Sequence, residues 1–358
     1  MLRREGSTSF RRKGIPAALG LLGVFCVSCP LGSFAQAEVS PSGEPASTLA
    51  DSIASGVNRV FQERRAAVVK VRAKDGYGIR YGSGFFVDPA GTVFTHAGIV
   101  MKADDVTVIS NGRELPAKVV VTDMRSGIAM LKVEGNSPFI PAGTSDPVAV
   151  ASPLVMIGYP EDMDICPSFG IVAGFDRQYL GQYFSTTHIR ANMPVQRGQG
   201  GAPVLNMKGE AVGILVGRIE GGAACHILPI QAAEKVRLDF VRFGELRPGW
   251  VGVLVEDSEE PVEGSTAKVG ALDPTTPAAQ SGLRQGDVLL RIGDISVGSS
   301  EDVLDASYFL TAGDVANIEV MRGGQRMNFS VKPGLHPLAP SRQMQAVAPE
   351  AGSELRLE

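Results

Sequence analysis

Covalent acyl transfer needs an activated hydroxyl or thiol beside a base, so the serines, threonines, cysteines and histidines of this chain come first. No serine occurs within residues 186–257, and no threonine within 188–265. The only thiol in those intervals is Cys225, and His226 follows it directly. Adjacent residues of a strand face opposite ways, so this pair is not expected to work as nucleophile and base.

Three segments nevertheless have the form of protease motifs, each with glycine at the key position. The first runs from Arg197 to Asn206 and reads RGQGGAPVLN. It resembles the G-N-S-G-G-P-L-x-N segment of trypsin-like proteases of the HtrA/DegP family, and Gly200 stands where that family has its nucleophilic serine. A glycine has no side chain and cannot attack a carbonyl.

The other two segments agree with the first. Residues 95–100, THAGIV, resemble the family's T-N-x-H-V-V motif and place Gly98 at the base position. Residues 126–132, SGIAMLK, resemble T-D-I-A-L-L-K and place Gly127 at the acid position. Since a serine protease needs all three side chains, we predict a protease fold without catalytic residues.

The histidines offer no obvious replacement for the base. His96 lies two positions before Gly98, on the same side of a strand but with its backbone roughly 7 Å away at ~3.3 Å per residue. His188 and His336 are single histidines without a partner motif. No spacing typical of a metal or nucleotide site occurs, so we predict neither metal nor cofactor.

The elements that must position these residues are mostly short strands. Gly82–Asp88 and Val106–Ile109 are examples, and the latter runs into Asn111-Gly112, a strong hairpin signal. Further runs of this kind are 67–71, 118–122, 128–133, 154–158, 170–172 and 211–216. We predict a mainly β chain, and the resemblance implies a trypsin-like double β-barrel over residues 64–246.

One convincing helix closes that region, and a second domain follows it. Ile230, Ala233, Val236 and Phe240 have helical spacing, and Gly244 stops the helix. Residues 247–335 then resemble a PDZ domain. The blocks that carry this resemblance are PTTPAAQSGL at 274–283 and GDVL at 286–289.

The PDZ resemblance implies a site for a peptide C-terminus. The loop Trp250-Val251-Gly252-Val253 is similar to the family's carboxylate-binding loop, and the strand Val253-Leu254-Val255 would pair with the peptide. A helix opened by Ser299 or Ser300 and ended by Gly313 would form the other wall. Plain core packing is the alternative for its apolar face. The predicted peptide-binding residues are Trp250, Val251, Gly252, Val253, Val255, Val303 and Leu310.

The ends of the chain complete the predicted organisation. Residues 1–37 have the basic start, apolar run and Ala35-Gln36-Ala37 cleavage site of a secretory signal peptide, so we expect export to the periplasm or cell envelope. A linker with a short helix from Thr48 to Glu63 occupies 38–63, and a disordered tail occupies 336–358. Cys166 and Cys225 remain after cleavage, as a disulfide or as two free thiols.

Formal net charge is −4, without a dense basic block past residue 80, which argues against a nucleic-acid partner. The first hypothesis is therefore an exported inactive homologue that binds protein C-termini or unfolded chains as adaptor, regulator or holdase. An endopeptidase with an unrecognised nucleophile and a PDZ-tethered structural scaffold are the alternatives. The resemblance also implies trimers joined near Phe61, or mixed assembly with active relatives.

Overall fold

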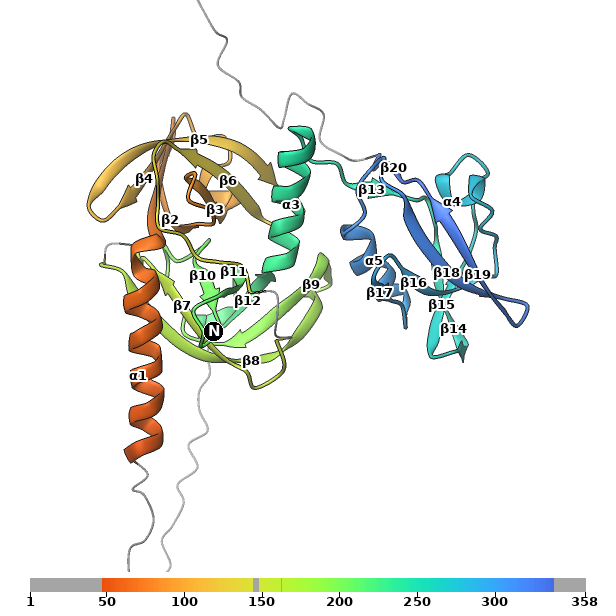
Figure 1. Ribbon diagram of the computed structural model, residues 1–358, viewed down its shortest axis with the longest axis horizontal. Coiled ribbons are helices and arrows are strands. Elements are labelled where there is room, and N and C mark those ends of the chain that lie inside the picture. Colours follow the sequence, from red (N-terminus) through yellow and green to blue (C-terminus); the bar gives the residue numbers. More distant parts are fainter. Residues whose placement is uncertain (1–46, 144–147, 162, 338–358) are drawn as a thin grey trace, which may run out of the picture. The chain divides into compact units, whose positions relative to one another are not determined.

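The computed structural model describes residues 47–337 apart from 144–147 and 162, and it is mainly β (Figure 1). The predicted signal peptide, the start of the linker and the predicted tail from residue 338 lie outside the described residues. None of the described helices has both the length and the apolar character needed to cross a bilayer.

The first barrel is closed, with its strands hydrogen-bonded in the order β1-β2-β3-β6-β5-β4. Asn111-Gly112 forms the turn between two of these strands with φ of 49° and 76°, the backbone that tight hairpins require, so the predicted hairpin is confirmed. A short helix, α2 (Ala97–Val100), follows the third strand. The strands are β1 (Val68–Asp75), β2 (Gly78–Phe86), β3 (Thr92–His96), β4 (Asp105–Ser110), β5 (Arg113–Asp123) and β6 (Ile128–Val133).

The second barrel is also closed, in the order β10-β11-β12-β9-β8-β7. With it the predicted double β-barrel is confirmed. All of its strands are antiparallel to their neighbours, so short turns join most of them. The strands are β7 (Pro153–Gly158), β8 (Cys166–Tyr179), β9 (Gln182–Asn192), β10 (Pro203–Leu205), β11 (Ala211–Arg218) and β12 (Ala224–Pro229).

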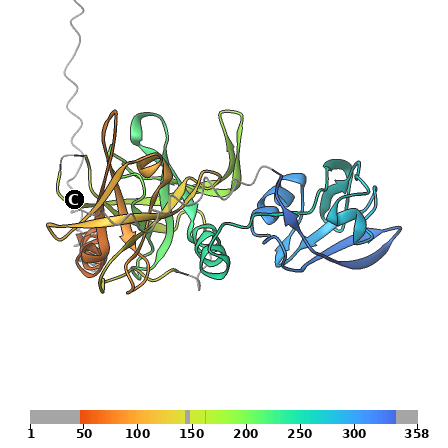
Figure 2. The same ribbon diagram turned by 90° about the horizontal axis from the view of Figure 1, so that it is seen from above.

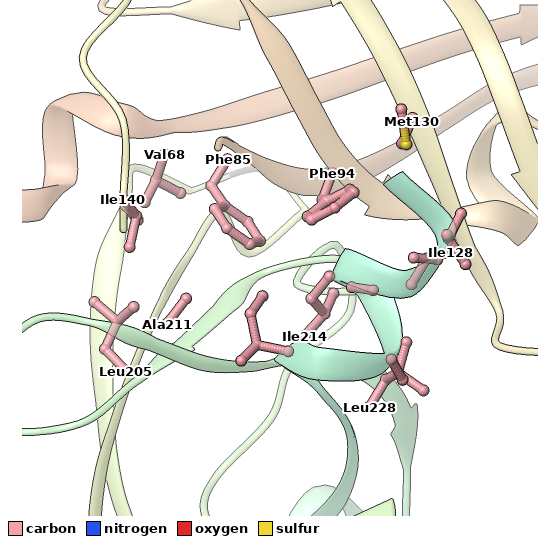
Figure 3. Packing of buried hydrophobic residues seen from close by; sticks show 14 of the residues in the cluster. Val68, Phe85, Phe94, Ile128, Met130, Ile140, Leu205, Ala211, Ile214 and Leu228 are labelled. Atoms are coloured by element: carbon pink, nitrogen blue, oxygen red, sulfur yellow. The ribbon is translucent and has the colours of Figure 1, made fainter. Parts of the chain in front are cut away.

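One hydrophobic cluster joins the two barrels. Phe85 and Phe94 of the first barrel meet edge to face, with ring centroids 6.0 Å apart. Ile214 and Leu228 of the second barrel belong to the same buried cluster, and Figure 3 shows these side chains facing one another. Burial of each large apolar side chain contributes roughly 1.5–3 kcal/mol. This shared core therefore fixes how β3 and β11 lie relative to each other.

Two longer helices pack on this core. α1 (Ser47–Arg64) covers the predicted 48–63 helix, and its Phe61 is partly buried against the shared core. α3 (Ile230–Phe243) buries the predicted apolar face: Ile230, Ala233 and Val236 are buried, and Phe240 packs beside them. Gly244 ends α3 in a left-handed cap, so the predicted stop is confirmed.

The C-terminal part has its own core and its own sheet, coloured from teal to blue (Figure 1, Figure 2). The sheet order is β14-β15-β16-β18-β19, which leaves β14 at an edge, and β17 pairs with β16. A separate two-stranded ladder joins β13 to β20. The elements are β13 (Gly249–Trp250), β14 (Val255–Val262), β15 (Ser265–Val269), α4 (Pro277–Gln280), β16 (Val288–Ile292), β17 (Ile295–Ser296), α5 (Ser300–Tyr308), β18 (Ala316–Arg322), β19 (Gln325–Val331) and β20 (Gly334–Leu335).

Two predicted boundaries in this part were wrong. The strand expected from Val253 begins only at Val255, because the chain from Val251 to Leu254 is irregular. The helix α5 does open at Ser299, with a capping box closed by Asp302, but it ends at Tyr308. Leu310 therefore lies beyond the helix.

Candidate functional site

The three glycines at the triad positions lie around a single side chain, that of His96. Gly98 is in α2, Gly127 directly precedes β6, and Gly200 lies in the turn before β10. A Cβ atom placed on Gly98 would be 2.9 Å from His96 Cε1. On Gly127 it would be 3.8 Å from His96 Nε2, and on Gly200 it would be 3.8 Å from His96 Cβ. The fold thus brings together three positions that are far apart in sequence, and an imidazole lies between them.

A hydrogen bond holds the His96 ring in one orientation. Its Nδ1 accepts from the backbone N–H of Gly98 at 3.1 Å, which caps α2. Because a nitrogen that accepts an N–H carries no proton itself, we assign the ring proton to Nε2, and the imidazole is neutral. Burial lowers the pKa of His96, and the nearby backbone carbonyl of Val216 in β11 partly opposes that shift.

Several hydrogen bonds hold the turn that carries Gly200. The backbone N–H of Ser83 donates to the Gly200 carbonyl at 2.9 Å, and its hydroxyl donates to the Gly198 carbonyl at 3.0 Å. Gly201 N–H donates to Leu215 at 2.8 Å. Gly201 has φ of 84°, and a Cβ there would lie 2.3 Å from the Ser83 carbonyl oxygen. Ser83 is fully buried, and only the Gly82-Ser83-Gly84 pattern pointed to it in sequence.

The atoms nearest to the Gly200 Cβ position carry no hydroxyl or thiol group. The three heavy atoms nearest to the Cβ position of Gly200 are Cβ and Cγ of His96 and Cδ1 of Ile99, all of them carbons. Ser126 lies next to Gly127 in sequence, but its hydroxyl donates to Asp123 at 2.9 Å. The backbone N–H groups of Gly198 and Gly200 have no acceptor among the described residues, so the turn keeps free donors.

Both cysteines are free thiols in the structure, which is the second of the two sequence alternatives. Cys225 is fully buried, and burial raises the pKa of its thiol to about 12. A thiol that stays protonated at neutral pH is a poor nucleophile. Cys166 is half-buried, with Sγ 3.9 Å from the side-chain amide of Gln199, and burial raises its pKa too.

The remaining barrel histidines are buried and satisfied. His188 Nδ1 is 2.7 Å from the Thr186 carbonyl, and its ring stacks on Phe184 with centroids 4.2 Å apart. Burial lowers the pKa of His188 to about 4. His226 Nε2 is 3.0 Å from a carboxylate oxygen of Asp176 and makes no pair with Cys225. These contacts fit structural histidines.

No group of three or more His, Cys, Asp or Glu side chains in residues 47–337, gaps excepted, is arranged to hold a metal. His336 lies near the end of the described chain, where its backbone N–H donates to the Pro248 carbonyl at 3.0 Å.

The loop from Trp250 to Val253 presents unused donors. Among the described residues, the backbone N–H groups of Val251, Gly252 and Val253 have no hydrogen-bond acceptor. Gly252 has φ of 74°, and a Cβ there would lie 2.5 Å from Cγ2 of Thr276 and 2.9 Å from the Trp250 ring. Successive N–H groups in such a loop form a concavity suited to an anion.

Some of the residues predicted to line a peptide groove beside this loop belong to the hydrophobic core. Val303 and Leu310, predicted to face a peptide, are 9% and 7% exposed and belong to the PDZ core, while Val253 and Val255 pack against it. Leu254 is 58% exposed, and its carbonyl accepts from Gly270 on the β15 side. The opposite side of β14 carries no strand, so an extended segment has room to pair there.

Residues 82–214 match the trypsin-like peptidase domain family, and residues 249–332 match the PDZ domain family. A "Probable periplasmic serine endoprotease DegP-like" of Pseudomonas putida (strain GB-1) is 32% identical over 269 residues, covering 72% of this chain and 56% of that protein. The protein of the same description from Halomonas elongata is 30% identical with the same coverage. The chain thus spans about half the length of these curated relatives.

Solved structures agree on the fold. The structure titled "HtrA-type protease AlgW with tripeptide" superposes with a TM-score of 0.66 at 23% identity, covering 78% of this chain and 97% of that one. A serine endoprotease from Yersinia pestis gives a TM-score of 0.58 at 23% identity, with 78% and 98% covered. The chain therefore consists of an HtrA/DegP-like trypsin-like peptidase domain followed by one PDZ domain.

Proposed function

We propose that this protein is a catalytically inactive HtrA-like serine protease homologue that binds polypeptides mainly through its PDZ domain. The observation that carries the proposal is the glycine at each of the three triad positions, Gly98, Gly127 and Gly200, around one neutral imidazole. Acyl transfer requires a nucleophile within reach of a base. The nearest neighbours of the Gly200 Cβ position are carbons, which supports inactivity.

The PDZ loop supports peptide binding. Three successive N–H groups from Val251 to Val253 have no acceptor among the described residues and suit the terminal carboxylate of a peptide. The free edge at Val255 offers backbone groups for the residues that precede that carboxylate. The ligand class is therefore a protein C-terminus or an unfolded chain with an accessible end, and the protein acts as an adaptor, a regulator or a holdase.

The place of action is the periplasm. The relatives of Pseudomonas putida and Halomonas elongata are described as periplasmic, and residues 1–37 have the pattern of a signal peptide cleaved after Ala37. Homotrimers or mixed assembly with an active relative are routes by which an inactive copy would regulate others.

The test is binding of a peptide pool with and without its terminal charge. The chain from Glu38 is titrated into fluorescein-labelled decapeptides of mixed sequence that end in a free apolar residue, and fluorescence polarisation is measured. The same pool with amidated ends is the control. Charge-assisted hydrogen bonds contribute about 1.5–3 kcal/mol, so amidation should weaken binding by roughly tenfold or more. Equal binding of both pools would overturn the assignment of the loop.

The descriptions of the relatives favour a second candidate, an active endopeptidase. Incubation of the same chain with denatured casein, followed by mass spectrometry of new termini, distinguishes the two. We expect no new termini over a long incubation. Cleavage that persists after rigorous removal of contaminating proteases would establish the endopeptidase instead.

A further inference from the structure

We propose that His96 is a plug: its imidazole occupies the space that a catalytic triad would need and joins the two barrels across that space. The ring does not act as a surviving catalytic base. It replaces the missing side chains as packing, and its presence prevents the triad from being restored at Gly98, Gly127 and Gly200 alone.

The first step in the argument is steric. Ordinary contacts to a Cβ atom begin near 3.4 Å, yet a Cβ on Gly98 would be 2.9 Å from Cε1 and 3.1 Å from Nδ1 of His96. The ring and any side chain at Gly98 therefore compete for one volume. The neighbouring Gly200 does not have this conflict, since its Cβ position is 3.8 Å from the nearest atom of His96.

The second step is the anchoring of the ring. His96 ends β3 of the first barrel, where it pairs with Ile128, and its ring lies near the Val216 carbonyl in β11 of the second barrel. Its Nδ1 accepts from Gly98 in α2. The ring is thus held at one nitrogen in a mostly buried site, and moving it aside costs that hydrogen bond together with its packing.

The third step is the acid position. Gly127 has φ of 77°, a backbone conformation that an aspartate adopts only with strain. A side chain there would also start 3.8 Å from Nε2 of the fixed ring. The triple replacement Gly98→His, Gly127→Asp and Gly200→Ser therefore meets the ring at one position and backbone strain at another.

The packing role of His96 is tested by thermal unfolding, whereas the proposed function is tested by peptide binding. A negative result for one therefore leaves the other intact. The chain from Glu38 is unfolded by heat, and far-UV circular dichroism and calorimetry report the barrels. Trp250, the only tryptophan in the sequence, gives a fluorescence signal from the PDZ part and serves as an internal control. Four forms are compared: the parent, His96→Ala, Gly98→Ala and the double variant.

We expect the effect of Gly98→Ala on the midpoint temperature of barrel unfolding to change sign when the His96 ring is removed. Alanine is a better helix former than glycine, so Gly98→Ala should stabilise α2 once the ring is gone. With the ring present it should lower the barrel midpoint, because the added Cβ displaces the ring. His96→Ala alone should lower the midpoint by about 5 °C or more for a domain of this size. Equal effects of Gly98→Ala in both backgrounds would overturn the proposal.

Two controls keep the result interpretable. Gly200→Ala adds a Cβ at an ordinary contact distance, so its effect should be small and should add to that of His96→Ala. Free imidazole should raise the midpoint of His96→Ala and leave the parent unchanged, because the deleted ring leaves a space of its own shape. If imidazole raises neither midpoint, the ring does not fill an enclosed site and the plug is disproved.

Discussion

Two glycine-containing turns in this molecule, Gly198–Gly201 and Trp250–Val253, differ in the groups that surround them. Both expose backbone N–H groups, and both contain glycine at positive φ. In the first, a ring from β3 fills the adjacent space and buried Ser83 holds two carbonyls. In the second, three successive N–H groups have no acceptor among the described residues.

The comparison shows that a glycine-containing motif does not by itself indicate whether a turn forms a binding site. At Gly200 the absent side chain is the one that carries the nucleophile in the family, and the nearest atoms are carbons of His96 and Ile99 at ordinary contact distances. At Gly252 the absent side chain is what allows the backbone to pass close to Thr276 and the Trp250 ring at a positive φ. The groups that lie beside each glycine, rather than the glycine itself, therefore distinguish the two turns.

The largest expected effect comes from breaking the turn at Gly198–Gly201. Gly201→Ala would place a Cβ 2.3 Å from the Ser83 carbonyl oxygen and 2.6 Å from the His96 amide nitrogen, on a backbone of positive φ. We expect a loss of more than about 3 kcal/mol in the free energy of unfolding, or no folded protein. Urea denaturation followed by circular dichroism measures it. A loss below about 1 kcal/mol would show that the turn is not rigid.

The second largest effect is expected from acid, which should destabilise the barrels because buried His188 and His226 lie in them. The folded pKa of His188 is about 4 and the unfolded value is 6.5, so the unfolded chain binds the proton more readily. Stability is therefore full above pH 6.5 and is lost as pH falls toward 4, by roughly 3 kcal/mol at 1.36 kcal/mol per unit.

The matching control for acid is His188→Gln, which does not titrate. Denaturation curves at several pH values should show a smaller acid loss for this variant than for the parent. An identical acid loss in both proteins would mean that His188 is not the group responsible.

A smaller effect is expected from breaking the loop at Trp250–Val253. Gly252→Ala would bring a Cβ within 2.5 Å of Thr276 and should weaken binding of the free-acid peptide pool roughly tenfold by tilting the donors. Gly264→Ala is the matched control, because Gly264 has φ of 84° in the same domain but no atom within 4 Å of its Cβ position. If both variants bind equally well, the loop is not the site.

The smallest effect is expected from placing a hydroxyl group at Gly200 alone. Gly200→Ser fits the turn at ordinary contact distances, so stability should change by less than about 1 kcal/mol. The new hydroxyl has no base beside it, since Nδ1 of His96 is already occupied by Gly98. Casein incubation should give no new peptide termini, and cleavage by this single variant would refute the plug.

Most of the fold was predictable from local pattern. The pattern of strands and turns predicted a mainly β chain, and the family resemblance implied the double barrel. The helical spacing from Ile230 with its stop at Gly244 predicted α3 almost to the residue. These features depend on neighbours in sequence, such as Asn111-Gly112, whose positive φ values belong to the dipeptide itself.

The site was predictable only in part, because the direction and burial of its side chains depend on residues that are distant in sequence. Sequence placed the backbone of His96 near Gly98, but its ring lies beside Val216, some 120 positions away. The core burial of Val303 and Leu310 likewise depends on packing across the sheet. The end of α5 at Tyr308 carries no glycine or proline signal of its own.

The free edge of β14 has one more consequence, for solubility. An unpaired strand edge invites another copy of the chain to continue the sheet. Here that edge carries Glu256, Asp257, Glu259 and Glu260, all exposed, so two copies approaching edge to edge repel each other. High salt screens the charges of exposed side chains, so it would weaken this repulsion and favour edge-to-edge contact between copies.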